Sequence, residues 1–233
     1  MAIFKLQAIN VALICLLLSY PKSMLADVTQ PRDILGAQNC RMVLKQETRS
    51  CRVIFHGLCD GGRSVATYFQ NGEQQYTRIM VDGVNMIASR SGPTGLIFNR
   101  QSEGDDPVDR SIIENGGIDT FSFRSVDDAD QGIVITMSGT VRKLEKTRRV
   151  SGQNISYLFW DWTYQVNGPN QSYVSKVETT SELHDALDIW LANYVESRDQ
   201  YGRMEITDDQ ATALIHPNEV SFSSKDMVCM HGV

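Results

Sequence analysis

Residues 155–166 constrain the fold of this chain more than any other stretch. Read with a period of two, large apolar side chains point to one side of the stretch and polar side chains to the other. This pattern is typical of a long β-strand with one buried face. Turn residues at 167–170 then predict that residues 171–179 return antiparallel to it. The apolar face comprises Leu158, Trp160, Trp162, Tyr164 and Val166.

The chain before this stretch reads as a series of short β runs. Turn residues separate the runs, and Asp82–Gly83 is a preferred two-residue hairpin turn because both positions tolerate a positive φ. Polar residues 101–117 interrupt the series, and we expect an exposed loop there with a helical turn around 110–114. The runs lie at 41–45, 51–55, 65–69, 76–81, 84–88, 96–98, 120–124 and 133–141.

After residue 179 the apolar period changes to that of a helix. Thr179 and Glu182 predict a capping box, in which both side chains satisfy free amide groups at a helix start. The spacing of three and four residues that follows is typical of an amphipathic helix, here about four turns ending before Gly202. A second short helix is expected within 207–216. The apolar helix face comprises Leu183, Ala186, Leu187, Trp190, Leu191 and Tyr194.

These patterns predict one mainly β domain over residues 27–233. No internal repeat or linker divides the chain, and 233 residues suffice for one sizeable core. We expect an antiparallel barrel, or a two-sheet sandwich, with one C-terminal amphipathic helix packed on it.

Residues 1–26 have the features of a signal peptide. Lys5 precedes an apolar run at 8–18 that is too short to span a bilayer, and Ala26 ends a stretch of small residues. We therefore expect export to the periplasm or the exterior, with cleavage after Ala26. An uncleaved membrane anchor is the alternative.

Export favours a structural role for the remaining cysteines. Cys40, Cys51, Cys59 and Cys229 are even in number, and an oxidising compartment favours two disulfides among three possible pairings. We favour Cys40 with Cys51, which would close a short hairpin, and Cys59 with Cys229. The second bond would contribute roughly 4–5 kcal/mol by closing a long loop.

A cysteine hydrolase is one alternative function. Residues 57–61 (Gly-Leu-Cys-Asp-Gly) have the form of a nucleophile elbow with Cys in place of Ser. Catalysis would need Cys59 exposed at a strand-to-helix turn, with a later Asp and His. The β-rich pattern and the expected disulfide both favour a structural Cys59 instead.

Other chemistries receive little support. The four histidines are too far apart in the sequence to indicate a metal site, and we expect no metal and no cofactor. A net charge of −6 argues against nucleic acid as a partner. The basic cluster at 142–149 is either a solvated hairpin end or a contact for anionic lipid or polysaccharide.

We therefore predict a non-catalytic exported protein that binds an apolar small molecule or an envelope component. Trp160, Trp162, Tyr164 and Trp190 are the candidate ligand-binding residues, since an aromatic face lines either the core or a cavity. The alternative is a protein-interaction module, such as an envelope-assembly factor, an inhibitor or a secreted effector, which would use exposed loops like 101–117.

The aromatic face of 155–166 is predicted to be the docking site of the expected helix, with any ligand held between the two. Trp160→Ala should then reduce stability before it reduces ligand binding, because the ring is first of all a packing element. Thermal unfolding and ligand titration of the same variant would establish the order. Weaker binding at unchanged stability would indicate a pocket instead.

Overall fold

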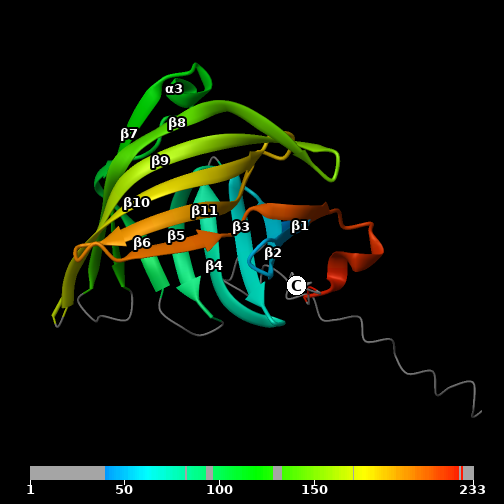
Figure 1. The fold of residues 1–233 in the computed structure, drawn as a ribbon, viewed down its shortest axis with the longest axis horizontal. Coiled ribbons are helices and arrows are strands. Elements are labelled where there is room, and N and C mark those ends of the chain that lie inside the picture. The colour runs from blue at the N-terminus through cyan, green and yellow to red at the C-terminus, as the bar shows by residue number, and fades with distance from the viewer. Residues whose placement is uncertain are drawn as a thin grey trace, which may run out of the picture.

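The described residues of the computed structural model form one antiparallel sheet of 13 strands (Figure 1). Each strand from β1 to β11 pairs with the next along the chain, β13 pairs with β1, and β12 and β13 are therefore the two edges. The structure describes residues 40–81, 83–92, 97–127, 133–169, 171–225 and 227, so the expected signal peptide at 1–26 lies outside it. The strands are β1 (Cys40–Thr48), β2 (Arg52–Cys59), β3 (Arg63–Gln70), β4 (Glu73–Val81), β5 (Asn85–Ser91), β6 (Ile97–Asp106), β7 (Ile118–Asp127), β8 (Val134–Val150), β9 (Gln153–Gly168), β10 (Gln171–His184), β11 (Ile189–Asp199), β12 (Met204–Asp208) and β13 (Ala211–Ile215).

The predicted mainly β, antiparallel architecture is confirmed. Over the described residues, each predicted β run matches a strand to within one residue, and the long run at 155–166 lies within the 16 residues of β9. The helical turn expected around 110–114 is the short helix α3 (Arg110–Glu114), which begins where the Asp109 carboxylate accepts a hydrogen bond from the Ser111 amide at 2.8 Å. The expected loop at 101–117 is shorter than predicted, because β6 continues to Asp106.

The C-terminal amphipathic helix predicted after residue 179 is wrong. Those residues form the end of β10, a turn at 185–188, and β11. Residues 181–184 are all buried although two of them are a glutamate and a histidine, so this part of the strand shows no alternation of polar and apolar residues. Because a four-residue turn separates the two strands, their apolar residues happen to recur in the sequence every three or four positions, as in an amphipathic helix. The capping-box residues Thr179 and Glu182 therefore belong to a strand.

The second predicted helix, at 207–216, is also wrong. This segment contains the end of β12 and all of β13, which are the two edges of the sheet, so the expected barrel is not closed. Only Asp209 and Gln210 separate the two edge strands. Asp209 forms an ion pair with Arg52 at 2.7 Å, which fixes the crossing from one edge to the other. Among the described residues, the remaining regular element is the 3₁₀ helix η1 (Val220–Ser223).

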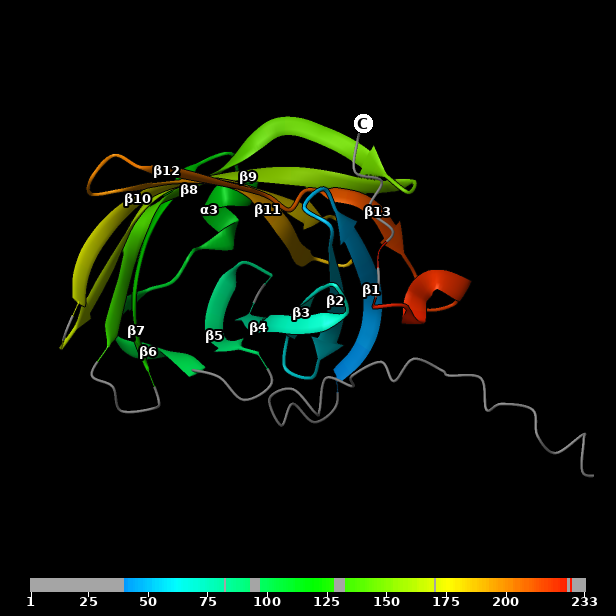
Figure 2. The same ribbon diagram turned by 60° about the horizontal axis from the view of Figure 1, so that its bottom comes forward.

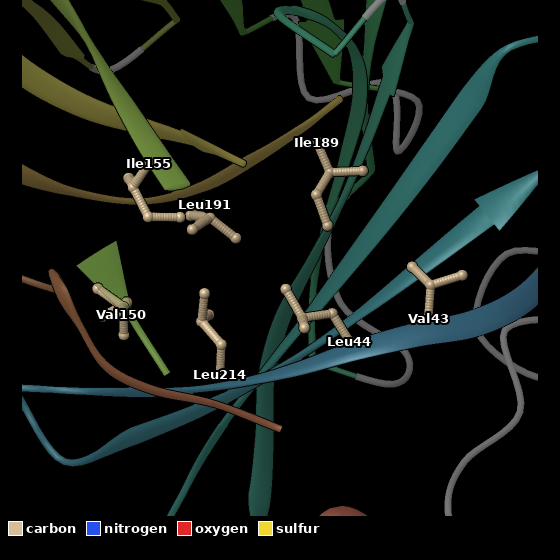
Figure 3. Packing of buried hydrophobic residues seen from close by; sticks show 8 residues of the cluster. Val43, Leu44, Val150, Ile155, Ile189, Leu191 and Leu214 are labelled. Atoms are coloured by element: carbon tan, nitrogen blue, oxygen red, sulfur yellow. The ribbon is translucent and has the colours of Figure 1, made fainter. Parts of the chain in front are cut away.

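The sheet curls so that the strands near its two edges approach each other (Figure 2). A buried aliphatic cluster joins side chains of β1 and β13 to side chains of β8, β9 and β11 (Figure 3). Burial of these apolar side chains stabilises the curl, since each fully buried Leu or Ile contributes about 1.5–3 kcal/mol. The cluster comprises Val43, Leu44, Val150, Ile155, Ile189, Leu191, Ala211 and Leu214.

The predicted cysteine pairing is wrong. Cys40 is bonded to Cys59, and the two residues are direct cross-strand partners in β1 and β2. The turn between these strands lies at residues 49–51, and this register places position 40 opposite position 59. Cys51 is also disulfide-bonded. Cys229 lies outside the described residues.

A histidine is buried inside the sheet beside polar neighbours. His56 of β2 is 1% exposed, and its Nε2 lies 2.9 Å from Oε1 of Gln46 on β1. Burial, with a smaller effect from His184, lowers the pKa of His56 to about 3. His56 is therefore neutral in the folded protein throughout the usual pH range.

This buried histidine predicts that the protein loses stability in mild acid. Between the unfolded pKa of about 6.5 and the folded pKa of about 3, the unfolded chain binds a proton that the folded chain does not. The free energy of unfolding should therefore fall as the pH falls, by about 1.4 kcal/mol per pH unit from this side chain alone. Urea unfolding at several pH values measures the slope. His56→Gln should lose the contribution of His56 to the pH slope of the free energy of unfolding. The same substitution at the half-buried His216 is the control. An unchanged slope in His56→Gln would show that His56 does not cause the acid sensitivity.

Candidate ligand cavity

A cavity of about 660 Å³ lies against the apolar face of β9. Directly opposite residues of neighbouring strands share one face of a sheet, so the register defines rows of side chains along the cavity wall. Three such rows cross β9. They are Phe123–Met137–Tyr164–Ser175–Asp199, Phe121–Gly139–Trp162–Val177–Ser197–Glu205 and Val141–Trp160–Thr179–Val195.

The four residues predicted to bind ligand all line this one cavity: Trp160, Trp162, Tyr164 and Trp190. Trp160 and Trp190 stack with ring centroids 5.6 Å apart and planes at 13°, and Trp162 meets Tyr164 edge to face at 6.2 Å. Trp190 reaches the aromatic group from β11 and not from a helix as predicted. Their role in binding a ligand stays a prediction. These residues include all three tryptophans of the chain.

Trp160 is both a core residue and a wall residue. It is 6% exposed, and it packs in a buried cluster with Phe121 of β7, Val141 of β8 and Leu158 of β9. Its ring meets that of Phe121 edge to face at 5.4 Å. The predicted docking of a helix on this face is wrong, because the ring packs against neighbouring strands and against β11 of the curled sheet.

One end of the cavity is closed by two turns and by a pair of hydrogen bonds between β5 and the segment before α3. The Asn85 side chain donates to the Val108 carbonyl at 3.1 Å and accepts from the Val108 amide at 2.9 Å, which ties β5 to the segment before α3. A Cβ atom at Gly83, in the turn after β4, would lie 2.7 Å from the Asp188 carbonyl oxygen in the turn before β11. This close approach brings β4 and β11 together at the closed end.

The other end of the cavity is more open. The turn between β11 and β12 lies there, held by an ion pair between Asp199 and Arg203 at 2.6 Å. Tyr173 is 37% exposed and Met204 is 54% exposed, whereas Trp160 is 6% exposed. Exposure of apolar side chains therefore increases along the cavity towards this turn.

Arg78 is the wall residue that sequence reasoning missed. Its guanidinium carbon lies 5.4 and 5.1 Å from the ring centroids of Tyr68 and Tyr76 and 6.0 Å from that of Trp190, all within the range of cation–π attraction. The two tyrosine rings stack with centroids 4.0 Å apart. A signal was present in the sequence: Arg78 is a cation between Tyr76 and Met80 on one face of an alternating run.

Within the described ranges, neither a metal site nor a membrane-crossing helix is found. No three His, Cys, Asp or Glu side chains gather as metal ligands would. Helices there lack the length and apolar character needed to cross a bilayer. Cys59 ends β2, is bonded to Cys40 and is followed by β3, so the strand-to-helix turn of a nucleophile elbow is not formed.

Comparisons with known proteins give no family for the chain. No family model matches it, and no curated protein matches its sequence. Among solved structures, the crystal structure of the hypothetical lipoprotein YmcC from Escherichia coli K12 matches with a TM-score of 0.34 and 14% sequence identity, over 76% of this chain and 87% of that one. At this level of similarity the cavity has to be interpreted from its own geometry.

The glycine opposite Trp162 is predicted to be required for the cavity wall. A Cβ atom at Gly139 would lie 2.5 Å from Cβ of Trp162 and would also collide with the Asp161 carbonyl oxygen. Gly139→Ala should therefore lower the free energy of unfolding by about 1–3 kcal/mol. Urea unfolding tests this, with Thr140→Ala at the exposed neighbouring position of β8 as the control. Equal stability of Gly139→Ala and the unchanged protein would show that the two strands separate at little cost.

Proposed function

We propose that this protein is a non-catalytic binding protein of the cell envelope or exterior that holds an elongated apolar small molecule in the cavity beside β9. The observation that carries the proposal is the cavity itself, about 660 Å³ in volume and walled mainly by aromatic and aliphatic side chains. This volume lies within the range of about 300–1,000 Å³ that is typical of sites for whole small molecules.

The length of the wall favours an elongated ligand. At about 3.3 Å per residue, the four steps from Trp160 to Tyr164 span roughly 13 Å and the nine steps from Trp190 to Asp199 roughly 30 Å. Both pairs line the same cavity. A chain-like or flat extended molecule fits this shape better than a compact one.

The wall's polar groups favour an apolar ligand over a sugar. Asn85 is bonded to Val108, the Thr179 hydroxyl accepts from Nε1 of Trp162 at 3.3 Å, and Asp199 is paired with Arg203. A sugar needs several free donors and acceptors, because buried hydroxyl groups without partners are costly. These three groups already have partners within the protein.

The location rests on the cysteines and the expected signal peptide. A disulfide such as Cys40–Cys59 is typical of proteins from oxidising compartments. Together with the signal-like residues 1–26, it supports an envelope or extracellular setting.

A protein-interaction module is the second candidate, and one surface favours it. Tyr201, Met204 and Ile206 are large apolar side chains that are each more than half exposed, and the last two belong to the edge strand β12. An unpaired strand edge beside exposed apolar side chains is a common docking surface for another chain.

Filling part of the cavity should weaken ligand binding. All three tryptophans line the cavity, so their fluorescence reports on its contents, and N-phenyl-1-naphthylamine serves as an uncharged apolar probe. Ser197→Phe adds a ring to the wall and should weaken probe binding by about tenfold or more, since overpacking costs about 1–3 kcal/mol.

Ser172→Phe is the matched control, because Ser172 lies on the exposed side of β10. It should leave probe binding unchanged. If the unchanged protein does not bind the probe, or if both variants bind it equally well, the cavity is not an apolar ligand site and the interaction module becomes the better proposal. Native mass spectrometry of protein from its own host would then be expected to show no small molecule bound.

A further inference from the structure

Arg78 places a positive charge at the closed end of the apolar cavity. It lies three residues before the end of β4, on the strand whose following turn approaches Asp188 at the start of β11. Its guanidinium faces Trp190, which comes two residues after Asp188. The cavity therefore has an inner end with a cation and an outer end at the turn between β11 and β12.

This charge has no carboxylate partner among the described residues, because no carboxylate oxygen there lies within 4.0 Å of the Arg78 guanidinium. The acidic side chain that acts on Arg78 electrostatically is Asp209, which forms its own ion pair with Arg52 at 2.7 Å. Of the other charged residues in the wall, Asp199 and Arg203 pair with each other. Glu205 lies on β12, at the outer end.

The aromatic rings around Arg78 compensate only part of its charge. Cation–π attraction is weaker than the hydration that a charge loses when it is removed from water. The guanidinium also has five N–H donors in a planar fork that fits a carboxylate or a phosphate with two parallel hydrogen bonds. An acid that enters the cavity would thus gain a charge-assisted contact at its inner end.

We propose that the ligand of this cavity is an amphiphile with one acidic group, a carboxylate or a phosphate, that binds Arg78 at the inner end. Its apolar part lies along Trp160, Trp162 and Tyr164 towards the turn between β11 and β12. This proposal rests on the proposed function and specifies its ligand. The two sources of the acidic group, a fatty acid or a phosphate ester, are distinguished by the experiment.

The experiment compares three ligands with the same ten-carbon chain: decan-1-ol, decanoate and decyl phosphate. Their affinities are measured by displacement of N-phenyl-1-naphthylamine and by isothermal titration calorimetry. We expect at least one acid to bind the unchanged protein about tenfold more tightly than decan-1-ol. Arg78→Met should bring the ratio of acid affinity to alcohol affinity, both measured on the same variant, close to one, because the charged contact is removed.

Arg124→Met is the matched control, since Arg124 is exposed on β7 and does not line the cavity. It should keep the preference of the unchanged protein. Arg78→Lys is the second variant, in case Arg78→Met does not fold: it keeps the charge but loses the planar fork, so the preference should decrease without disappearing.

The outcomes separate the two proposals. A preference for decanoate alone identifies a carboxylate ligand, and a preference for decyl phosphate identifies a phosphate ester. If the unchanged protein binds all three ligands equally, or if Arg78→Met keeps the preference, the acid site is refuted and the apolar cavity stands. If neither decan-1-ol nor either acid binds, the proposed function fails and the acid site fails with it.

Discussion

The buried carboxylate of Glu182 holds the two ends of the sheet together. It is fully buried in β10, accepts a hydrogen bond from the Ala211 amide at 3.0 Å and forms an ion pair with Arg148 of β8 at 2.5 Å. The Arg148 guanidinium also donates to the Ala211 carbonyl at 2.7 Å. Because Ala211 begins the strand that pairs with β1, these contacts fix the first strands of the sheet against the long ones. Burial raises the pKa of Glu182, so these contacts offset a real desolvation cost.

The cavity is a consequence of this curl. At one end of the curled sheet, aliphatic side chains such as Leu44, Ile155 and Leu214 fill the space between the strands. Beside the middle of β9 the side chains are rings, which pack edge to face or stack and leave space between the walls. Gly139 lets β8 approach Trp162 closely, which lets that ring lie in the wall. The curled sheet thus encloses a tightly packed aliphatic cluster at one end and a cavity lined by aromatic rings beside β9.

The sequence predicted those structural features that depend only on residues close together in the chain. The alternation in 155–166 identified β9 and the shared face of Trp160, Trp162 and Tyr164, because a strand fixes the direction of its side chains. The prediction from alternation failed in the last part of β10, where both faces of the strand are buried and polar residues such as Glu182 and His184 lie inside. A helix was predicted there instead.

Contacts between distant strands were beyond the sequence. Arg78 reaches Trp190 only because the sheet curls, and Cys40 pairs with Cys59 because the hairpin turn lies near residue 50. A pattern within β4 shows that Arg78 shares a face with apolar residues, but not which strand lies across from it. The sequence therefore predicted the aromatic wall of the candidate site but not the positive charge of Arg78 within it.

The crossing at residues 209–210 has a further consequence, for the behaviour of the protein in a crowded solution. An open sheet of many strands presents two rows of free backbone groups that can recruit other chains and start aggregation. Here both edges belong to one continuous segment and are only five residues long each, β12 on one side and β13 on the other. Each of the two edge strands therefore offers only a short row of free backbone groups to another chain, although the sheet does not form a closed ring.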